Sequence, residues 1–176
     1  MNMKVYLRAL EQEDYKTIAI WRNDTEITDL LGGNRFYVSE SREKGWVEQA
    51  IKDDRRNLYL GICLKDKNEI IGLVNLTSID MLNQKAEFSI LIGNKEYHGK
   101  GLGKISTELM LKHAFEQMNL NKVWLTVLSQ NKKAIKLYKG IGFHEEGVVR
   151  EDVYKNNKYQ DMIMMSILKS EYDRQL

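Results

Sequence analysis

Residues 90–104 read ILIGNKEYHGKGLGK, in which an apolar strand ends in a glycine-rich turn and the turn leads into a helix. Glycines in such a turn let backbone N–H groups approach an anion closely, and the positive end of the helix dipole lies just behind them. Lys100 and Lys104 add positive charge to the same place. The stretch therefore predicts a loop that cradles a pyrophosphate.

Two other kinds of phosphate loop do not fit this stretch. A nucleoside-triphosphate loop needs glycine where His98 stands and serine or threonine where Ile105 stands. A dinucleotide loop needs its third glycine where Lys104 stands. For the stretch taken alone, a glycine-rich turn that serves only to start a helix stays open as the alternative.

A second motif follows after one further predicted helix and strand, and residues 131–143 read NKKAIKLYKGIGF. They match each fixed position of Asn-x-x-Ala-x-x-Leu-Tyr-x-x-x-Gly-Phe, the second cofactor motif of the GNAT N-acetyltransferases. Residues 98–103 resemble the acetyl-CoA loop of that superfamily, written Arg/Gln-x-x-Gly-x-Gly/Ala. Gly101 and Gly103 match this loop, whereas His98 departs from the usual Arg or Gln. The resemblance covers at least residues 58–168.

The two ends of the chain resemble particular branches of the superfamily. Residues 158–161 and 165–172 are similar to the tails of enzymes that acetylate ribosomal-protein N-termini and of enzymes that acetylate spermidine. Residues 21–23 resemble enzymes that acetylate nucleotide-linked amino sugars. The resemblance implies an acetyl-CoA-dependent acyltransferase that acts on a primary amine by direct attack in a ternary complex. A peptide N-terminus, a polyamine and an amino sugar stay open as acceptors.

Helices and strands alternate along the chain in a mixed order. Residues 85–92 predict a strand because Ala86 and Phe88 alternate with Glu87 and Ser89, and polar turns at 65–68 and 155–157 predict hairpins. The mixture predicts the α/β (α+β) class in a single domain over 1–176. The resemblance implies a mixed, mostly antiparallel central sheet with a splayed parallel pair and helices on both faces. The expected helices are 11–21, 39–54, 102–118 and 131–139, and the expected strands are 5–7, 58–64, 70–76, 85–92, 123–128, 143–150 and 159–168.

The resemblance also implies how acetyl-CoA is held. Backbone groups at the end of strand 85–92 would pair with the pantetheine arm, and one of these amides would polarise the thioester carbonyl. The glycine loop would cradle the pyrophosphate, and Asn131 would hydrogen-bond the cofactor arm. The predicted cofactor-binding residues are Leu91, Ile92, Gly93, His98, Gly99, Lys100, Gly101, Leu102, Gly103, Lys104, Asn131, Ala134 and Tyr138.

Two residues are candidates for the proton transfers that amide formation requires. The resemblance implies that Tyr138 lies near the sulfur and protonates the departing thiolate, and a core aromatic on an amphipathic helix is its structural alternative. Glu87 points to the opposite strand face from Ala86 and Phe88, and a carboxylate on a central strand is costly unless something uses it. Glu87 is the candidate base or amine anchor, with a solvated or salt-bridged glutamate as the equal alternative.

The acceptor is expected to bind the N-terminal helices and the loop that joins them. Acidic residues there would suit a cationic polyamine, and arginines would suit a phosphate-bearing amino sugar equally well. The predicted substrate residues are Trp21, Arg22, Asn23 and Glu87, the acidic residues are Asp24, Glu26 and Asp29, and the arginines are Arg22 and Arg35.

Composition narrows the partners. A net charge of only +2 argues against a nucleic-acid binder. Cys63 is the single cysteine of the sequence and cannot form an internal disulfide, which favours a reducing cytoplasm. The three histidines lack metal-ligand spacing, and no apolar run is long enough to span a membrane. Acetyl-CoA without a metal is the expected co-substrate, and a homodimer is the assembly that the resemblance suggests.

Two other functions stay open at this point. A non-catalytic CoA-sensing module of the same fold would keep Gly101, Gly103 and Asn131 but would need neither a base nor an acid. The presence of Tyr138 and Glu87 disfavours it. A nucleotide-binding protein that uses the glycine loop is disfavoured by the two failed loop patterns.

Overall fold

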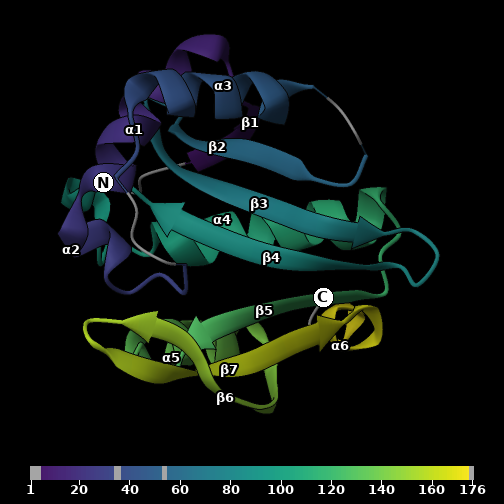
Figure 1. The fold of residues 1–176 in the computed structure, drawn as a ribbon. Coiled ribbons are helices and arrows are strands. Elements are labelled where there is room, and N and C mark those ends of the chain that lie inside the picture. The colour runs from purple at the N-terminus through teal and green to yellow at the C-terminus, as the bar shows by residue number, and fades with distance from the viewer. Residues whose placement is uncertain (1–4, 34–36, 53–54, 175–176) are drawn as a thin grey trace.

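A seven-stranded sheet forms the centre of the computed structural model, which describes residues 5–33, 37–52 and 55–174. Figure 1 shows the strands, whose order across the sheet is β1-β2-β3-β4-β5-β7-β6. Their bounds are β1 Val5–Ala9, β2 Leu58–Leu64, β3 Ile70–Asp80, β4 Lys85–Ile92, β5 Lys122–Leu128, β6 His144–Lys155 and β7 Lys158–Leu168. The order places β4 at the middle of the sheet.

Strands β4 and β5 pair in parallel, whereas the other neighbouring strands of the described sheet pair antiparallel. The parallel pairing joins Lys85–Glu87 to Lys122–Trp124 and goes no further. Beyond it β4 stays paired with β3, and β5 stays paired with β7 as far as Leu128. We call the region where the two strands part, residues 88–92 of β4 and 125–128 of β5, the splay (Figure 1).

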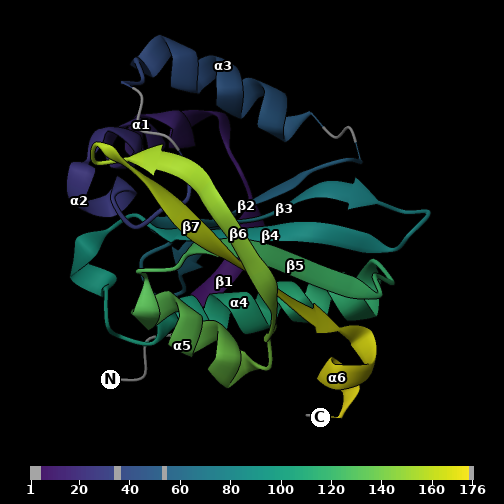
Figure 2. The same cartoon turned by 60° about the horizontal axis from the view of Figure 1, so that its bottom comes forward.

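Helices cover both faces of the sheet, as Figure 2 shows. Helices α1 and α3 lie on one face, and α4 and α5 lie on the other. The mixed, mostly antiparallel sheet with a splayed parallel pair and two helical layers, expected from the sequence, is confirmed. The helices are α1 Tyr15–Asn23, α2 Thr25–Thr28, α3 Glu40–Ile51, α4 Leu102–Lys112, α5 Lys132–Ile141 and α6 Lys169–Asp173, with short 3-10 turns η1 Gln12–Asp14 and η2 Lys95–Tyr97.

Each face of the sheet has its own core. Phe88, Leu102 and Met110 are buried between the sheet and the α4/α5 layer. Trp21 and Val47 are buried between the sheet and the α1/α3 layer. Burying one such side chain fully contributes about 1.5–3 kcal/mol, so the two clusters fix both helical layers against the sheet.

Most of the predicted helices and strands are present in the structure, but several of them end at other residues than predicted. Ser39 caps α3 by accepting from the N–H of Arg42 at 3.2 Å. The strand expected to end at residue 76 continues to Asp80 past an irregularity in its pairing with β4. The helix expected over 102–118 changes after Lys112 into a π-helical turn over 113–117, because its backbone there bonds five residues back.

Candidate active site

The splay exposes one edge of β4, and strand alternation determines which peptide groups lie on it. The N–H of Gly93 donates to the carbonyl of Ile71 in β3 at 2.9 Å. Peptide groups along a strand point alternately to its two neighbours, so the amide of Leu91 is also directed at β3. The N–H and C=O of Ile92 point the other way, into the splay. Of the three residues predicted to meet the cofactor arm, Ile92 is the one whose N–H and C=O both face the opening. The backbone contacts of all three with the cofactor stay a prediction.

The glycine loop begins α4 with backbone shapes that suit an anion. Gly99 and Gly101 have φ angles of 73° and 79°, in the left-handed region that side chains disfavour. A Cβ built at either glycine meets no atom within 4 Å, so the space beside the loop is open. The carbonyl of Gly101 accepts from the N–H groups of Lys104 and Ile105. The N–H groups of Leu102 and Gly103 come before the first hydrogen bond of the helix, so the helix itself offers them no acceptor. These donors fit a pyrophosphate at the helix start.

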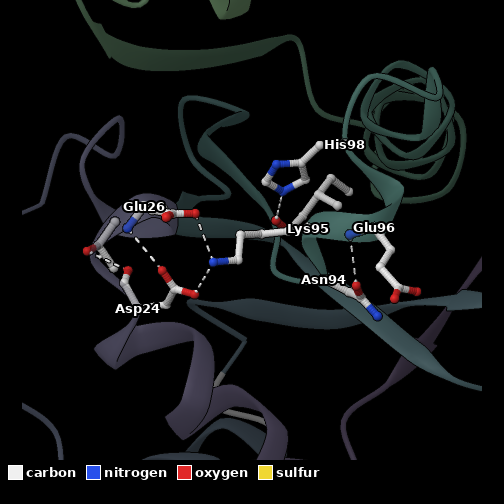
Figure 3. A network of polar contacts seen from close by, with 8 residues as sticks. Asp24, Glu26, Asn94, Lys95, Glu96 and His98 are labelled. Carbon is white, nitrogen blue, oxygen red and sulfur yellow. Dashed lines mark hydrogen bonds and ion pairs between the residues drawn. The ribbon is translucent and has the colours of Figure 1, made fainter.

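The side chains of the loop contribute unequally. Leu102 is buried in the core, so it can offer only its backbone amide to a ligand. Lys100 lies 5.3 Å above the ring of Tyr97, and Lys104 pairs loosely with Glu108 at 3.7 Å. His98 does not point at the loop, because its Nε2 lies 2.7 Å from the carbonyl oxygen of Ile92 (Figure 3).

Tyr138 projects from α5 toward the point where β4 and β5 part. Its ring lies 6.3 Å from that of Phe88, the first β4 residue beyond the parallel pairing, and 5.6 Å from that of Phe143. Burial raises the pKa of its hydroxyl to about 12, so the phenol stays protonated throughout the neutral range. Tyr138 is therefore packed as a core aromatic at the base of the splay, and its role as a proton donor stays a prediction.

Asn131 is engaged within the protein. Its Oδ1 accepts from the N–H of Ala134 at 3.1 Å and thereby caps α5. Its Nδ2 donates to the carbonyl of Leu30 at 3.2 Å. The predicted hydrogen bond from Asn131 to the cofactor arm would compete with these two contacts, and Ala134 has its amide already bonded.

Glu87 lies on the opposite face of the sheet from Tyr138. Its cross-strand neighbours are Thr77 on β3 and Trp124 on β5, and it is the last β4 residue of the parallel pairing. Its carboxylate makes no ion pair or hydrogen bond among the described residues, and burial raises the pKa of this carboxyl. Glu87 and Tyr138 therefore flank the base of the splay from its two faces.

The face around Glu87 is open, although it lies in the middle of the sheet. Ser89 is exposed on β4 and accepts at 3.1 Å from the amide of Asn75, its neighbour on β3. Asn75 in turn pairs with Tyr59 on β2, whose ring meets that of Trp46 on α3 at 5.1 Å. The sequence analysis did not predict this row of side chains, which consists of Glu87, Ser89, Asn75 and Tyr59. The alternation in 58–64 and 70–76 could have indicated a common face, but not that α3 covers Tyr59 while Ser89 stays exposed.

The predicted substrate residues 21–23 are held mostly by the protein itself. Trp21 is buried against Gly93, where an added Cβ would come within 2.0 Å of its ring. Arg22 pairs with the buried carboxylate of Glu43 at 3.4 Å and lies 4.9 Å above the ring of Trp46. Asn23 bonds both backbone groups of Val38. Arg35 lies outside the described residues.

The segment around α2 is tied to both sides of the splay. Lys95, just after β4, pairs with Asp24 at 2.8 Å and Glu26 at 2.9 Å (Figure 3). The ammonium of Lys155, buried at the turn between β6 and β7, donates to the carbonyls of Thr28 and Leu31, both at 2.6 Å. Lys95 therefore neutralises two of the acidic groups that the sequence offered to a cationic acceptor.

Metal ligands and membrane spans were also sought in the described ranges. Over 5–33, 37–52 and 55–174, no three His, Cys, Asp or Glu side chains are placed to hold a metal ion together. None of the helices in these ranges has the length and apolar character needed to cross a membrane.

Known proteins resemble this chain over nearly its whole length. The model of the acetyltransferase (GNAT) domain matches residues 4–144. The spermidine N(1)-acetyltransferase of Vibrio cholerae is 33% identical over 172 residues, covering 98% of this chain and 97% of that protein. A putative ribosomal N-acetyltransferase of Bacillus subtilis is 28% identical over 180 residues, covering 98% and 96%.

A solved structure agrees with the sequence comparison. The crystal structure of the Vibrio cholerae spermidine N-acetyltransferase in complex with CoA and spermine has a TM-score of 0.89 and 32% identity, covering 96% of this chain and 97% of that one. The open glycine loop at the start of α4 and the unpaired strand edge beside it fit the same co-substrate. The chain belongs to the GNAT family of acetyltransferases and is an N-acetyltransferase that takes its acetyl group from acetyl-CoA.

Proposed function

We propose that the acceptor is an aliphatic polyamine, acetylated at a primary amine that reaches Glu87 from the α1/α3 face. The observation that carries the proposal is the half-buried carboxylate of Glu87, which has no ion pair or hydrogen bond among the described residues. The Vibrio cholerae and Escherichia coli relatives named as spermidine N(1)-acetyltransferases support it, at 33% and 31% identity.

The surroundings of Glu87 suit a chain of methylene groups that carries positive charge. Trp124 lies beside Glu87, and Tyr59 and Trp46 lie at the far end of the row. Neighbouring strands are about 4.8 Å apart, so the row from β4 to β2 spans about 10 Å. Aromatic rings attract ammonium groups and also pack against methylenes. A polyamine laid across these strands would keep its reacting nitrogen at Glu87.

The charges near the row favour a cation over a phosphate-bearing sugar. Arg22 is the described arginine closest in sequence to the predicted acceptor loop, and Glu43 neutralises its charge. Burial raises the pKa of Glu43, and the nearby Arg22 opposes that rise. A phosphate would have to displace Glu43 from Arg22, whereas an ammonium group finds Glu87 without a competing partner.

The proton transfers follow from the placement of two side chains. Acetyl-CoA supplies, when bound, a thioester whose carbonyl carbon a neutral amine attacks to give an amide and the CoA thiol. An alkyl amine has a pKa near 10, so Glu87, in its ionised form, accepts the proton that the amine must lose. The N–H of Ile92, which faces the splay, donates to the carbonyl oxygen as negative charge develops. Tyr138 gives its proton to the sulfur from the other face.

The proposal is tested with a thiol-release assay on an acceptor panel. Spermidine, spermine, a peptide with a free N-terminus and a nucleotide-linked amino sugar are compared at equal concentration, with Glu87→Gln as the matched variant. We expect the polyamines to give the highest kcat/KM, reduced about 100-fold in the variant. Preference for the peptide or the sugar would overturn the acceptor class, and equal polyamine turnover by the variant would overturn the role of Glu87.

A homodimer is also proposed, with β6 as part of its interface. This 12-residue strand is the edge of the sheet and is exposed along most of its length, including Val148 and Tyr154. Exposed edge strands are templates for pairing with another chain. Light scattering on the purified protein should give twice the 20.6 kDa mass of one chain, and a monomer at all concentrations would refute it.

A further inference from the structure

His98 is bonded to the strand that receives the cofactor instead of to the phosphate loop beside it. Its Nε2 lies 2.7 Å from the carbonyl oxygen of Ile92, six residues earlier (Figure 3). A carbonyl oxygen only accepts hydrogen bonds, so Nε2 carries the proton and donates it. The contact therefore closes residues 92–98 into a loop.

The carbonyl that His98 contacts belongs to a particular peptide edge. Gly93 and Asn94 both donate to the carbonyl of Ile71, at 2.9 and 3.1 Å, and so hold the end of β4 against β3. Alternation along the strand turns the N–H and C=O of Ile92 toward the splay. In the described structure, His98 is the side chain bonded to that carbonyl. It therefore holds the Ile92–Gly93 peptide group on its open side, while Ile71 holds the same group from β3.

The same contact also sets the start of the phosphate loop. His98 ends the η2 turn and immediately precedes Gly99, where the backbone enters the left-handed region. A loop that is free to move must be ordered when a ligand binds, and that ordering weakens binding. A side chain that ties residue 98 back to residue 92 orders both ends of the segment in advance.

We propose that His98 is a positioning residue for acetyl-CoA, and that it acts through the carbonyl of Ile92 instead of through charge on the pyrophosphate. The inference rests on the placement of the cofactor arm along the Ile92 edge, and it does not depend on which amine is the acceptor. Its Nε2–H donor substitutes for the Arg or Gln that is usual at this place.

Glutamine and asparagine separate this role from the alternatives. The amide nitrogen of glutamine is as many bonds from Cα as Nε2 of histidine, whereas that of asparagine is one bond shorter. Calorimetry of acetyl-CoA binding without any amine should give a Kd within about twofold of wild type for His98→Gln. His98→Asn should raise the Kd about fivefold, the size expected for one partly exposed hydrogen bond. His144→Asn, at an exposed histidine on β6, is the matched control and should leave the Kd unchanged.

Hydrogen exchange supplies a second readout that needs no cofactor. In the free protein, amides of residues 94–98 should exchange faster in His98→Asn than in wild type, and His98→Gln should restore their protection. A Kd in His98→Asn equal to wild type would overturn the proposal. So would a raised Kd in His98→Gln that His98→Arg corrects, because charge and not the carbonyl contact would then be the cause.

Discussion

The cofactor half of the site and the acceptor half lie on opposite faces of the sheet, and they differ in whether backbone groups or side chains form them. In the site that we propose, backbone groups do most of the binding on the α4/α5 face: the amides at the start of α4 and the N–H of Ile92. On the α1/α3 face, side chains do it: Glu87, Asn75, Tyr59 and Trp46. Tyr138 is the exception on the first face, since it contributes a hydroxyl.

This difference determines how each face responds to substitution. A backbone amide survives the replacement of its side chain, so the cofactor half depends on conformation, above all on glycines with positive φ. A side-chain site changes its ligand when one residue changes. The cofactor half should therefore tolerate side-chain changes that keep the backbone shape, while the acceptor half should be redirected by single replacements.

The largest effect should come from the one side chain on which the backbone-built half depends. We expect Tyr138→Phe to lower kcat about 100- to 1,000-fold with little change in KM, because general acid catalysis of this kind contributes at that level. Stability should hold or rise, since the ring stays packed against Phe88 and a buried hydroxyl is removed. Pre-steady-state thiol release checks the rate, and wild-type kcat would reduce Tyr138 to a core aromatic.

The role of Glu87 on the acceptor face can be tested through the pH dependence of activity and stability. The base must be ionised, so kcat/KM of the wild type should fall as pH is lowered through the raised pKa of Glu87, and Glu87→Gln should lack that limb. A carboxyl with a raised pKa in the folded state loses stability as pH rises through that pKa. Glu87→Gln should therefore unfold at a higher temperature than wild type at neutral pH and not at acid pH. A variant less stable than wild type at neutral pH would contradict this.

Two neighbouring glycines test the backbone-built half directly. Gly101→Ala forces a side chain into a backbone with φ of 79°, so we expect the Kd for acetyl-CoA to rise about tenfold, equivalent to about 1–2 kcal/mol. Gly103→Ala is the matched control, because its Cβ would sit 3.8 Å from Leu137, in ordinary contact. Its Kd should stay within about twofold. Equal effects at both positions would mean that side-chain bulk, and not conformation, governs the loop.

The smallest effect is expected where surface charges join the two halves. Lys95→Ala breaks the pairs with Asp24 and Glu26 and should lower Tm by no more than about 3 °C, since exposed ion pairs contribute little. Lys95 holds the pKa of Asp24 below its usual range, so its contribution is present above that range and is lost as pH falls. Thermal melts of the two proteins should converge in acid and in high salt. A difference that persists in both would point to packing.

The glycine loop at the start of α4 could be predicted from the sequence because the residues that form it are neighbours in the chain. Glycines 101 and 103 and the fixed positions of 131–143 lie within short stretches, and Gly101 and Gly142 have positive φ angles that a side chain would strain. The direction of the Ile92 N–H and C=O could not be predicted from the sequence, because it depends on the register between β4 and β3. The contact of Trp21 with Gly93 and the pairing of Arg22 with Glu43 join segments far apart in sequence, so the sequence did not indicate them. The role of these residues toward the acceptor stays a prediction.

The buried ammonium of Lys155 has a consequence for the order in which the molecule is completed. It holds carbonyls that lie 122 to 127 residues earlier in the chain. During synthesis, the segment 28–33 leaves the ribosome long before its lysine exists, and contacts of such sequence separation form late in folding. The glycine loop, in contrast, is closed by neighbours. A nascent chain can thus shape its anion-binding turn well before the α2 segment gains its final anchor.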